Sequence, residues 1–82
     1  MKKTIYSKHS KIISERLVSI RKKAKLTQRE LAKKLKREHS FVAHCELGDR
    51  RVDLAEFYWI CTACGAVPHK EASELMKELE KL

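Results

Sequence analysis

Hydrophobic residues recur along this 82-residue chain at intervals of three and four, the spacing that places side chains on one face of an α-helix. The pattern predicts five helices, over about residues 11–24, 28–36, 39–47, 54–64 and 68–82. The second and third are too short to be stable in isolation, so their apolar faces must close on the neighbouring helices. We therefore expect an all-α fold in a single domain spanning residues 11–82.

Residue types at the predicted helix ends support these boundaries. Thr27 is followed three residues later by Glu30, and Asp53 by Glu56, which is the spacing of a capping box. Pro68 stands at the first turn of the last helix, where its missing N–H costs nothing. Each of these signals marks a helix start.

Only Lys36 to His39 separate the apolar runs of the second and third helices, which leaves room for nothing more than a tight turn. Two short helices joined in this way predict a helix-turn-helix, whose second helix lies in the DNA major groove. The turn lacks glycine, and Lys36 stands where a left-handed residue is often needed. If Lys36 adopts positive φ, the strain costs up to about 1 kcal/mol.

Charge strengthens the prediction of a DNA-binding protein. The net charge is +8, but residues 1–51 carry 16 Lys and Arg against five Asp and Glu, whereas residues 52–82 carry three against six. A basic half that contains the helix-turn-helix suggests one face for phosphate and another for protein. Residues 1–10 hold Lys2, Lys3 and Lys8 without periodicity and are expected to form a flexible basic arm, which either tracks DNA or is a disordered tail.

Other functional classes are disfavoured. No apolar run approaches the length of a membrane span, and the basic N-terminus precedes no apolar core of a signal peptide. Three cysteines without a secretory signal suggest reduced thiols and a cytoplasmic protein. Cys61 and Cys64 fall within a predicted helix with no second pair, so core packing is favoured over a metal or redox site. No catalytic constellation is present, so we expect neither an enzyme nor a bound cofactor.

The stretch from Leu17 to Gly65 resembles the Xre family of regulators, which are built like phage lambda-type repressors and Cro. The resemblance covers about 49 residues and has family spacing throughout. It is carried by a Gln-led second helix, an E-L-A core, a Glu-x-Gly end to the third helix and an A-x-G end to the fourth: Gln28, Glu30-Leu31-Ala32, Glu46-Leu47-Gly48 and Ala63-Cys64-Gly65. Departures are Lys36 in place of the usual glycine, and Cys45 in place of a larger apolar residue.

The family register assigns base reading to the outer face of the third helix. Four residues share this face at helical spacing: His39, Ser40, Ala43 and His44. The histidines could donate to guanine, and Ala43 offers a methyl group to thymine. DNA phosphates are expected to be contacted at the start of the second helix and after the third, by Thr27, Gln28, Arg50 and Arg51.

Two further sets of residues have expected structural roles. The resemblance implies that Arg21 and Glu46 form an ion pair that ties the first helix to the third. Arg16 is expected to face solvent. Candidate dimer contacts lie on the last two helices, with residues 68–82 contributing to dimerisation: Tyr58, Trp59, Leu75, Met76 and Leu79. Trp59 has an alternative place, packed beneath the last helix of its own chain.

Together these features predict a sequence-specific regulator of transcription that binds double-stranded DNA. The simplest form is a homodimeric repressor on a palindromic operator, with recognition helices roughly 34 Å apart. The alternative is an antitoxin or adaptor that binds a partner protein through the last two helices. Non-specific architectural binding is a third possibility.

Overall fold

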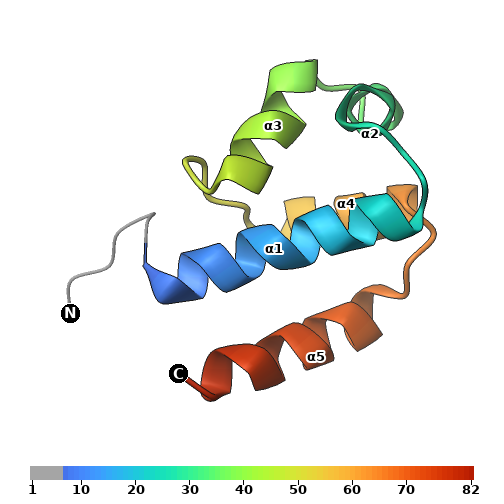
Figure 1. The fold of residues 1–82 in the computed structure, drawn as a ribbon. Helices are drawn as coiled ribbons and strands as arrows, with labels where there is room; N and C mark the ends of the chain where they lie inside the picture. Colours follow the sequence, from blue (N-terminus) through green and yellow to red (C-terminus); the bar gives the residue numbers. More distant parts are fainter. Residues whose placement is uncertain (1–6) are drawn as a thin grey trace.

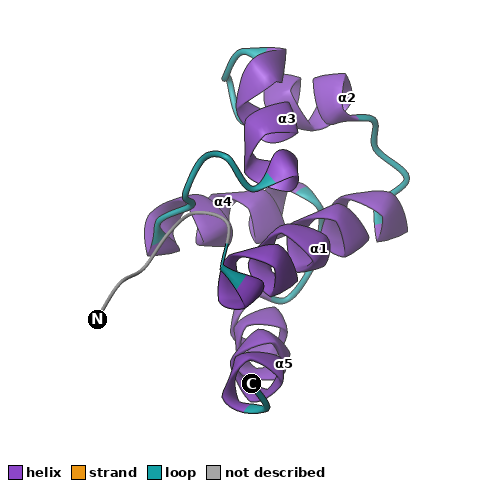
Figure 2. Cartoon of the chain, turned by 60° about the vertical axis from the view of Figure 1, so that its left-hand side comes forward, coloured by secondary structure: helices purple, strands orange, loops and turns teal. Residues whose placement is uncertain are grey.

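The computed structural model describes residues 7–82, and this part of the chain forms five α-helices without a strand (Figure 1). Their bounds are α1 Lys8–Lys23, α2 Gln28–Lys34, α3 His39–Leu47, α4 Leu54–Ala63 and α5 Pro68–Glu80. The predicted all-α, five-helix architecture is confirmed. The α2–α3 pair lies on one side of α1, and α5 lies on the other side against α1 and α4 (Figures 1 and 2).

The first helix begins three residues earlier than the pattern predicted. The Ser7 hydroxyl accepts a hydrogen bond from the Ser10 N–H at 3.1 Å and caps the helix. Lys8, His9 and Ser10 therefore belong to α1 and not to a flexible arm. The rest of the arm predicted over residues 1–10, namely residues 1–6, falls outside the described residues.

Both predicted capping boxes are present. The Thr27 hydroxyl accepts from the Glu30 N–H at 3.0 Å, and the Glu30 carboxylate accepts from the Thr27 N–H at 2.8 Å. Asp53 and Glu56 make the same reciprocal pair at the start of α4, with distances of 2.7 and 3.1 Å. These boxes satisfy backbone donors that a helix start leaves without partners.

Four helices end in a left-handed residue, which is lysine after α1 and α2 and glycine after α3 and α4, and the φ of Gly48 after α3 is 85°. Lys25 ends α1 with a φ of 59°, Lys36 ends α2 with a φ of 56°, and Gly65 ends α4 with a φ of 72°. After Lys36 the Arg37 N–H donates to the Ala32 carbonyl at 3.0 Å, which closes the end of α2. The positive φ considered for Lys36 is therefore observed, and it ends α2 two residues before the predicted position.

All five helices contribute to one core. Its buried residues are Leu17, Ile20, Leu31, Ala32, Phe41, Val42, Cys45, Phe57, Ile60, Cys61 and Leu75. The expected outward position of Arg16 is wrong, because its side chain is only 13% exposed and contacts Glu71, Glu74 and Glu78 of α5. Helical spacing could not reveal this, since the partners lie more than 50 residues away. Within the described part, no helix is both long and apolar enough to cross a membrane.

Candidate nucleic-acid interface

The outer face of α3 stands clear of the core. Phe41, Val42 and Cys45 are buried on the inner face. The structure brings the four predicted base-reading residues together on the opposite face, where His39 and His44 are exposed and Ser40 and Ala43 are half-buried. Leu47 continues this face one turn further and is 72% exposed, although sequence analysis assigned it no role. An apolar side chain in this place can contact a thymine methyl group.

His44 contacts an acid that the sequence analysis did not single out. Its ring Nδ1 lies 3.0 Å from Oδ1 and 3.1 Å from Oδ2 of Asp49, which follows α3 in the loop. Asp49 is five positions after His44 and lies outside α3, so helical spacing alone does not bring the two side chains together. The path of the loop after α3 does so.

The predicted pair of Arg21 and Glu46 is in contact and joins α1 to α3. Arg21 Nε and Nη2 donate to the two Glu46 oxygens at 2.7 and 3.0 Å, and Nη1 donates to the Leu26 carbonyl at 2.8 Å. The side chains are only 12% and 6% exposed. The hydrogen bonds to Glu46 raise the pKa of Arg21 above its ordinary value.

Gln28 is a third member of this cluster. Its side-chain Nε2 donates to Glu46 Oε1 at 2.9 Å, so the amide faces α3. Gln28 was expected to contact a DNA phosphate, and its bond to Glu46 was not expected. Thr27 is exposed, and its hydroxyl serves the capping box. The first turn of α2 is thus joined to the carboxylate that holds α3 to α1.

Arg50 and Arg51, both predicted phosphate contacts, lie in different environments. Arg50 donates to both oxygens of Glu56 at 3.0 and 2.9 Å and to the Arg51 carbonyl at 2.8 Å. Glu56 is 7% exposed, and these bonds lower the pKa of its carboxyl group. The structure therefore places the Arg50 guanidinium in the joint between α3 and α4, whereas Arg51 is exposed.

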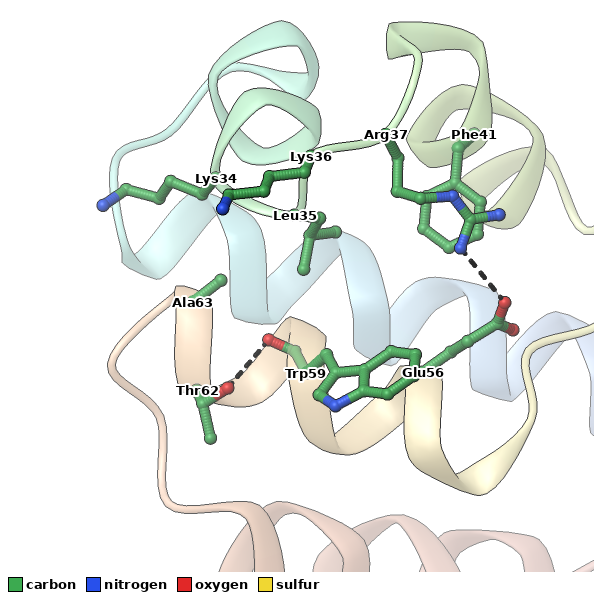
Figure 3. Close-up of a pocket in the computed structure, with 9 residues that line it drawn as sticks. All are labelled: Lys34, Leu35, Lys36, Arg37, Phe41, Glu56, Trp59, Thr62 and Ala63. Atoms are coloured by element: carbon green, nitrogen blue, oxygen red, sulfur yellow. Dashed lines mark hydrogen bonds and ion pairs between the residues drawn. The ribbon is translucent and has the colours of Figure 1, made fainter.

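A second arginine completes this joint. Arg37, in the turn between α2 and α3, lies 3.6 Å from Glu56 and 4.0 Å from the centroid of the Phe41 ring (Figure 3). The Arg50 guanidinium is 4.7 Å from the same centroid. Two cations over one aromatic ring, balanced by one buried carboxylate, hold the turn and α3 against α4. From the sequence, Glu56 was expected only to cap the fourth helix.

A groove of about 400 Å³ lies between the α2–α3 turn and α4 (Figure 3). Its apolar lining includes Leu35, Trp59 and Ala63, and its cationic lining includes Lys34, Lys36 and Arg37. The Trp59 side chain faces this groove and is 51% exposed. The alternative position for Trp59 beneath α5 is therefore wrong.

The five candidate dimer residues do not form one exposed surface. Leu75 is 5% exposed because α5 packs it into the core of its own chain, so its assignment to a dimer seam is corrected. Leu79 is half-buried against the same core, whereas Tyr58 and Met76 are 55% and 52% exposed. Tyr58 lines the junction of α4 with α5, on a different side of α4 from Trp59.

The paired cysteines of α4 lie in an apolar setting. Cys61 is completely buried, and burial raises the pKa of its thiol to about 11. Burial also raises the pKa of Cys64. A buried protonated thiol packs like a small apolar residue and is a poor nucleophile or metal ligand.

Comparison with known proteins agrees with this geometry. A family model described as "Helix-turn-helix domain" matches residues 12–75. The solved structure of an "XRE-family like protein from Pseudomonas syringae pv. tomato str. DC3000" is 34% identical, with a TM-score of 0.79 and 85% of each chain covered. No curated protein matches the chain. The matched helix-turn-helix and the identity over most of both chains show that this protein belongs to the Xre family of helix-turn-helix DNA-binding domains.

Proposed function

We propose that this protein is a transcriptional regulator that recognises a specific sequence in double-stranded DNA through the outer face of α3. The observation that carries the proposal is the division of α3 into a core face and a free face bearing two exposed histidines. Bonds from Arg21 of α1 to Glu46, and from Arg50 just after α3 to Glu56 of α4, hold the C-terminal end of the helix and thereby preorganise its free face for a groove.

Bases are read by His39, Ser40, Ala43 and His44, with Leu47 supplying an additional apolar contact. Phosphates are contacted by Arg51 and, at the start of α2, by Thr27 and Gln28. Arg50 acts through the α3–α4 joint, because its donors are already directed at Glu56 and the Arg51 carbonyl. Phosphate contacts supply affinity and register, and base contacts supply specificity.

The protein acts as a homodimeric repressor on a palindromic operator. Two-fold symmetry would space the recognition helices by about one turn of DNA. The exposed Tyr58 and Met76 support a seam on α4 and α5, since apolar side chains of this size are commonly covered in an assembly. Sedimentation of the wild type and of Met76→Glu tests the seam: the variant should remain folded and become monomeric.

Selection of bound sequences from random DNA tests the function itself. We expect a symmetric consensus with half-sites one helical turn apart. His44→Ala should weaken binding to that consensus by about 1–3 kcal/mol and leave binding to random DNA unchanged. Equal losses on both DNAs would remove His44 from base reading. A selection that yields no consensus would favour architectural binding, and increased transcription on binding would indicate an activator.

A second candidate function, binding of a partner protein, is favoured by the groove beside Trp59. Its cationic lining and half-exposed indole suit an acidic amphipathic helix. Co-expression with the product of the neighbouring gene should then give a stable complex. Trp59→Ala should abolish that complex and preserve DNA binding, whereas an unchanged complex would exclude the groove.

A further inference from the structure

The contact between Asp49 and His44 fixes which ring nitrogen of His44 carries a hydrogen. Both Asp49 oxygens lie within 3.1 Å of His44 Nδ1, and a carboxylate can only accept hydrogen bonds. His44 Nδ1 must therefore carry the hydrogen. In the neutral ring the other nitrogen, Nε2, is then an acceptor.

The backbone holds Asp49 in this place. Gly48 ends α3 with a φ of 85°, and a Cβ atom added to it would lie 3.0 Å from the Ser14 hydroxyl oxygen. The chain therefore leaves α3 through a turn that only glycine accommodates without strain. Asp49 is the first residue after that turn, which directs its carboxylate back to the last turn of α3.

We propose that Asp49 is a positioning residue that fixes His44 as a hydrogen-bond acceptor and thereby directs it to adenine or cytosine. In the major groove only the adenine N6 and cytosine N4 amino groups donate, whereas guanine N7 and O6 accept. A neutral His44 with hydrogen on Nδ1 has nothing to donate to guanine. This inference rests on the proposed role of α3 and replaces the initial expectation that His44 donates to guanine.

Protonation reverses the preference. A charged imidazole donates from both nitrogens, so His44 keeps its bond to Asp49 and offers Nε2–H to guanine. The other charged groups around the ring are Lys36, Arg37, Glu38 and Arg50, which line a second pocket together with His44, distinct from the groove beside Trp59. Arg37 and Arg50 are engaged with Glu56.

Nitrogen-15 NMR of the histidine ring tests the tautomer without DNA. At pH 8 the wild type should show the hydrogen on Nδ1 of His44, although neutral histidine in water carries it mainly on Nε2. Asp49→Ala should return His44 to the Nε2–H form. Glu38→Ala, which removes an exposed acid from the pocket that His44 also lines, should leave the His44 tautomer unchanged. An Nε2–H tautomer in the wild type would overturn the proposal whether or not the protein binds DNA.

Binding to the selected operator tests the consequence. At pH 8 the wild type should prefer adenine or cytosine at one operator position by about three- to tenfold, the range for one neutral hydrogen bond. His44→Ala should lose this preference. Asp49→Ala should abolish that preference, and Glu38→Ala should retain it. Once acidification protonates the imidazole, the wild type should shift towards guanine at this position, and His44→Gln should show no such shift. A guanine preference at pH 8, or one independent of Asp49, would refute the assignment, whereas absence of any consensus would instead refute the proposed function.

Discussion

Lys25 and Lys36 lie in a region of backbone conformation that glycine normally occupies, with φ values of 59° and 56°. A side chain there costs about 1–2 kcal/mol because Cβ approaches the following carbonyl oxygen. The strain persists because the surrounding hydrogen bonds and buried neighbours determine the path of the chain. At Lys36 the same residue lies in the turn that orients α3, so local strain and the geometry of the reading face are linked.

Replacement of Lys36 by glycine should stabilise the protein. Lys36→Gly is expected to raise the free energy of unfolding by about 0.5–1 kcal/mol, the relief of strain less the added freedom of the unfolded chain. Lys33→Gly is a matched control within α2 and should lower it by about 0.5–1 kcal/mol. Urea denaturation followed by circular dichroism measures both. If Lys36→Gly lowers the free energy of unfolding as much as Lys33→Gly does, the backbone at Lys36 is not strained.

Glu56 should make stability depend on pH. Arg50 lowers the pKa of this buried carboxyl, so its stabilisation is fully present above the unfolded-state value of about 4.3 and is lost as pH falls through the lower folded-state value. Glu56→Gln should reduce the free energy of unfolding by about 2 kcal/mol at pH 7. Denaturation curves at several pH values should show this difference shrinking below pH 4. If the difference between the wild type and Glu56→Gln stays constant over this pH range, the charge of Glu56 does not contribute to stability.

At the scale of elements, ion pairs between helices fix positions that apolar packing leaves adjustable. Glu46 of α3 receives bonds from α1 and α2, and Arg16 of α1 contacts three glutamates of α5. Such pairs are directional, whereas the core contacts beneath them are not. The angle of α3 therefore depends on a few polar side chains.

Loss of Glu46 should leave the nearly buried guanidinium of Arg21 without its charged partner. Glu46→Ala is expected to lower the free energy of unfolding by about 3 kcal/mol, because Arg21 loses its partner at 12% exposure. The double variant with Arg21→Ala should lose less than the two single variants combined. Glu38→Ala removes an exposed acid beside α3 and should change stability by less than about 0.5 kcal/mol. Additive losses in the double-mutant cycle would show that the pair is not coupled.

Across the whole molecule, positive charge collects on the half that contains α2 and α3. Residues 52–82 carry a net negative charge, and α5 lies on the opposite side of α1 from that pair (Figure 1). Arg16 neutralises part of the acidic row of α5 within the chain. If α3 docks on DNA as proposed, this charge distribution would favour approach of the α2–α3 side to a phosphate backbone.

Salt dependence should distinguish a phosphate contact from general charge. Arg51→Ala is expected to weaken binding to operator and random DNA alike and to reduce the slope of log K against log salt by about 0.9. Lys70→Ala removes the same charge from an exposed position on α5 and should leave the slope unchanged. Titrations at several salt concentrations measure both. An equal effect of the two variants would exclude a specific contact at Arg51.

The pattern of residue types predicted the helices because helix formation and capping depend on residues that are close together in sequence. Helical spacing located the five helices, and the capping boxes at Thr27 and Asp53 were readable because both partners lie within one turn. The outer face of α3 could also be predicted, since helical geometry alone separates His44 from Val42. Ser7 was missed as a cap, which placed the start of α1 three residues too late.

The tertiary structure decided which polar groups meet. Contacts of Arg16 with α5, of Gln28 with Glu46 and of Arg37 with Glu56 join residues far apart in sequence, so no periodicity encodes them. The same reason explains why Leu75 became a core residue and Trp59 turned towards α2: both depend on how helices dock. Thr27 to Gly48 could thus be recognised from sequence as a helix-turn-helix. What its third helix presents to DNA depends on side chains supplied by the rest of the fold.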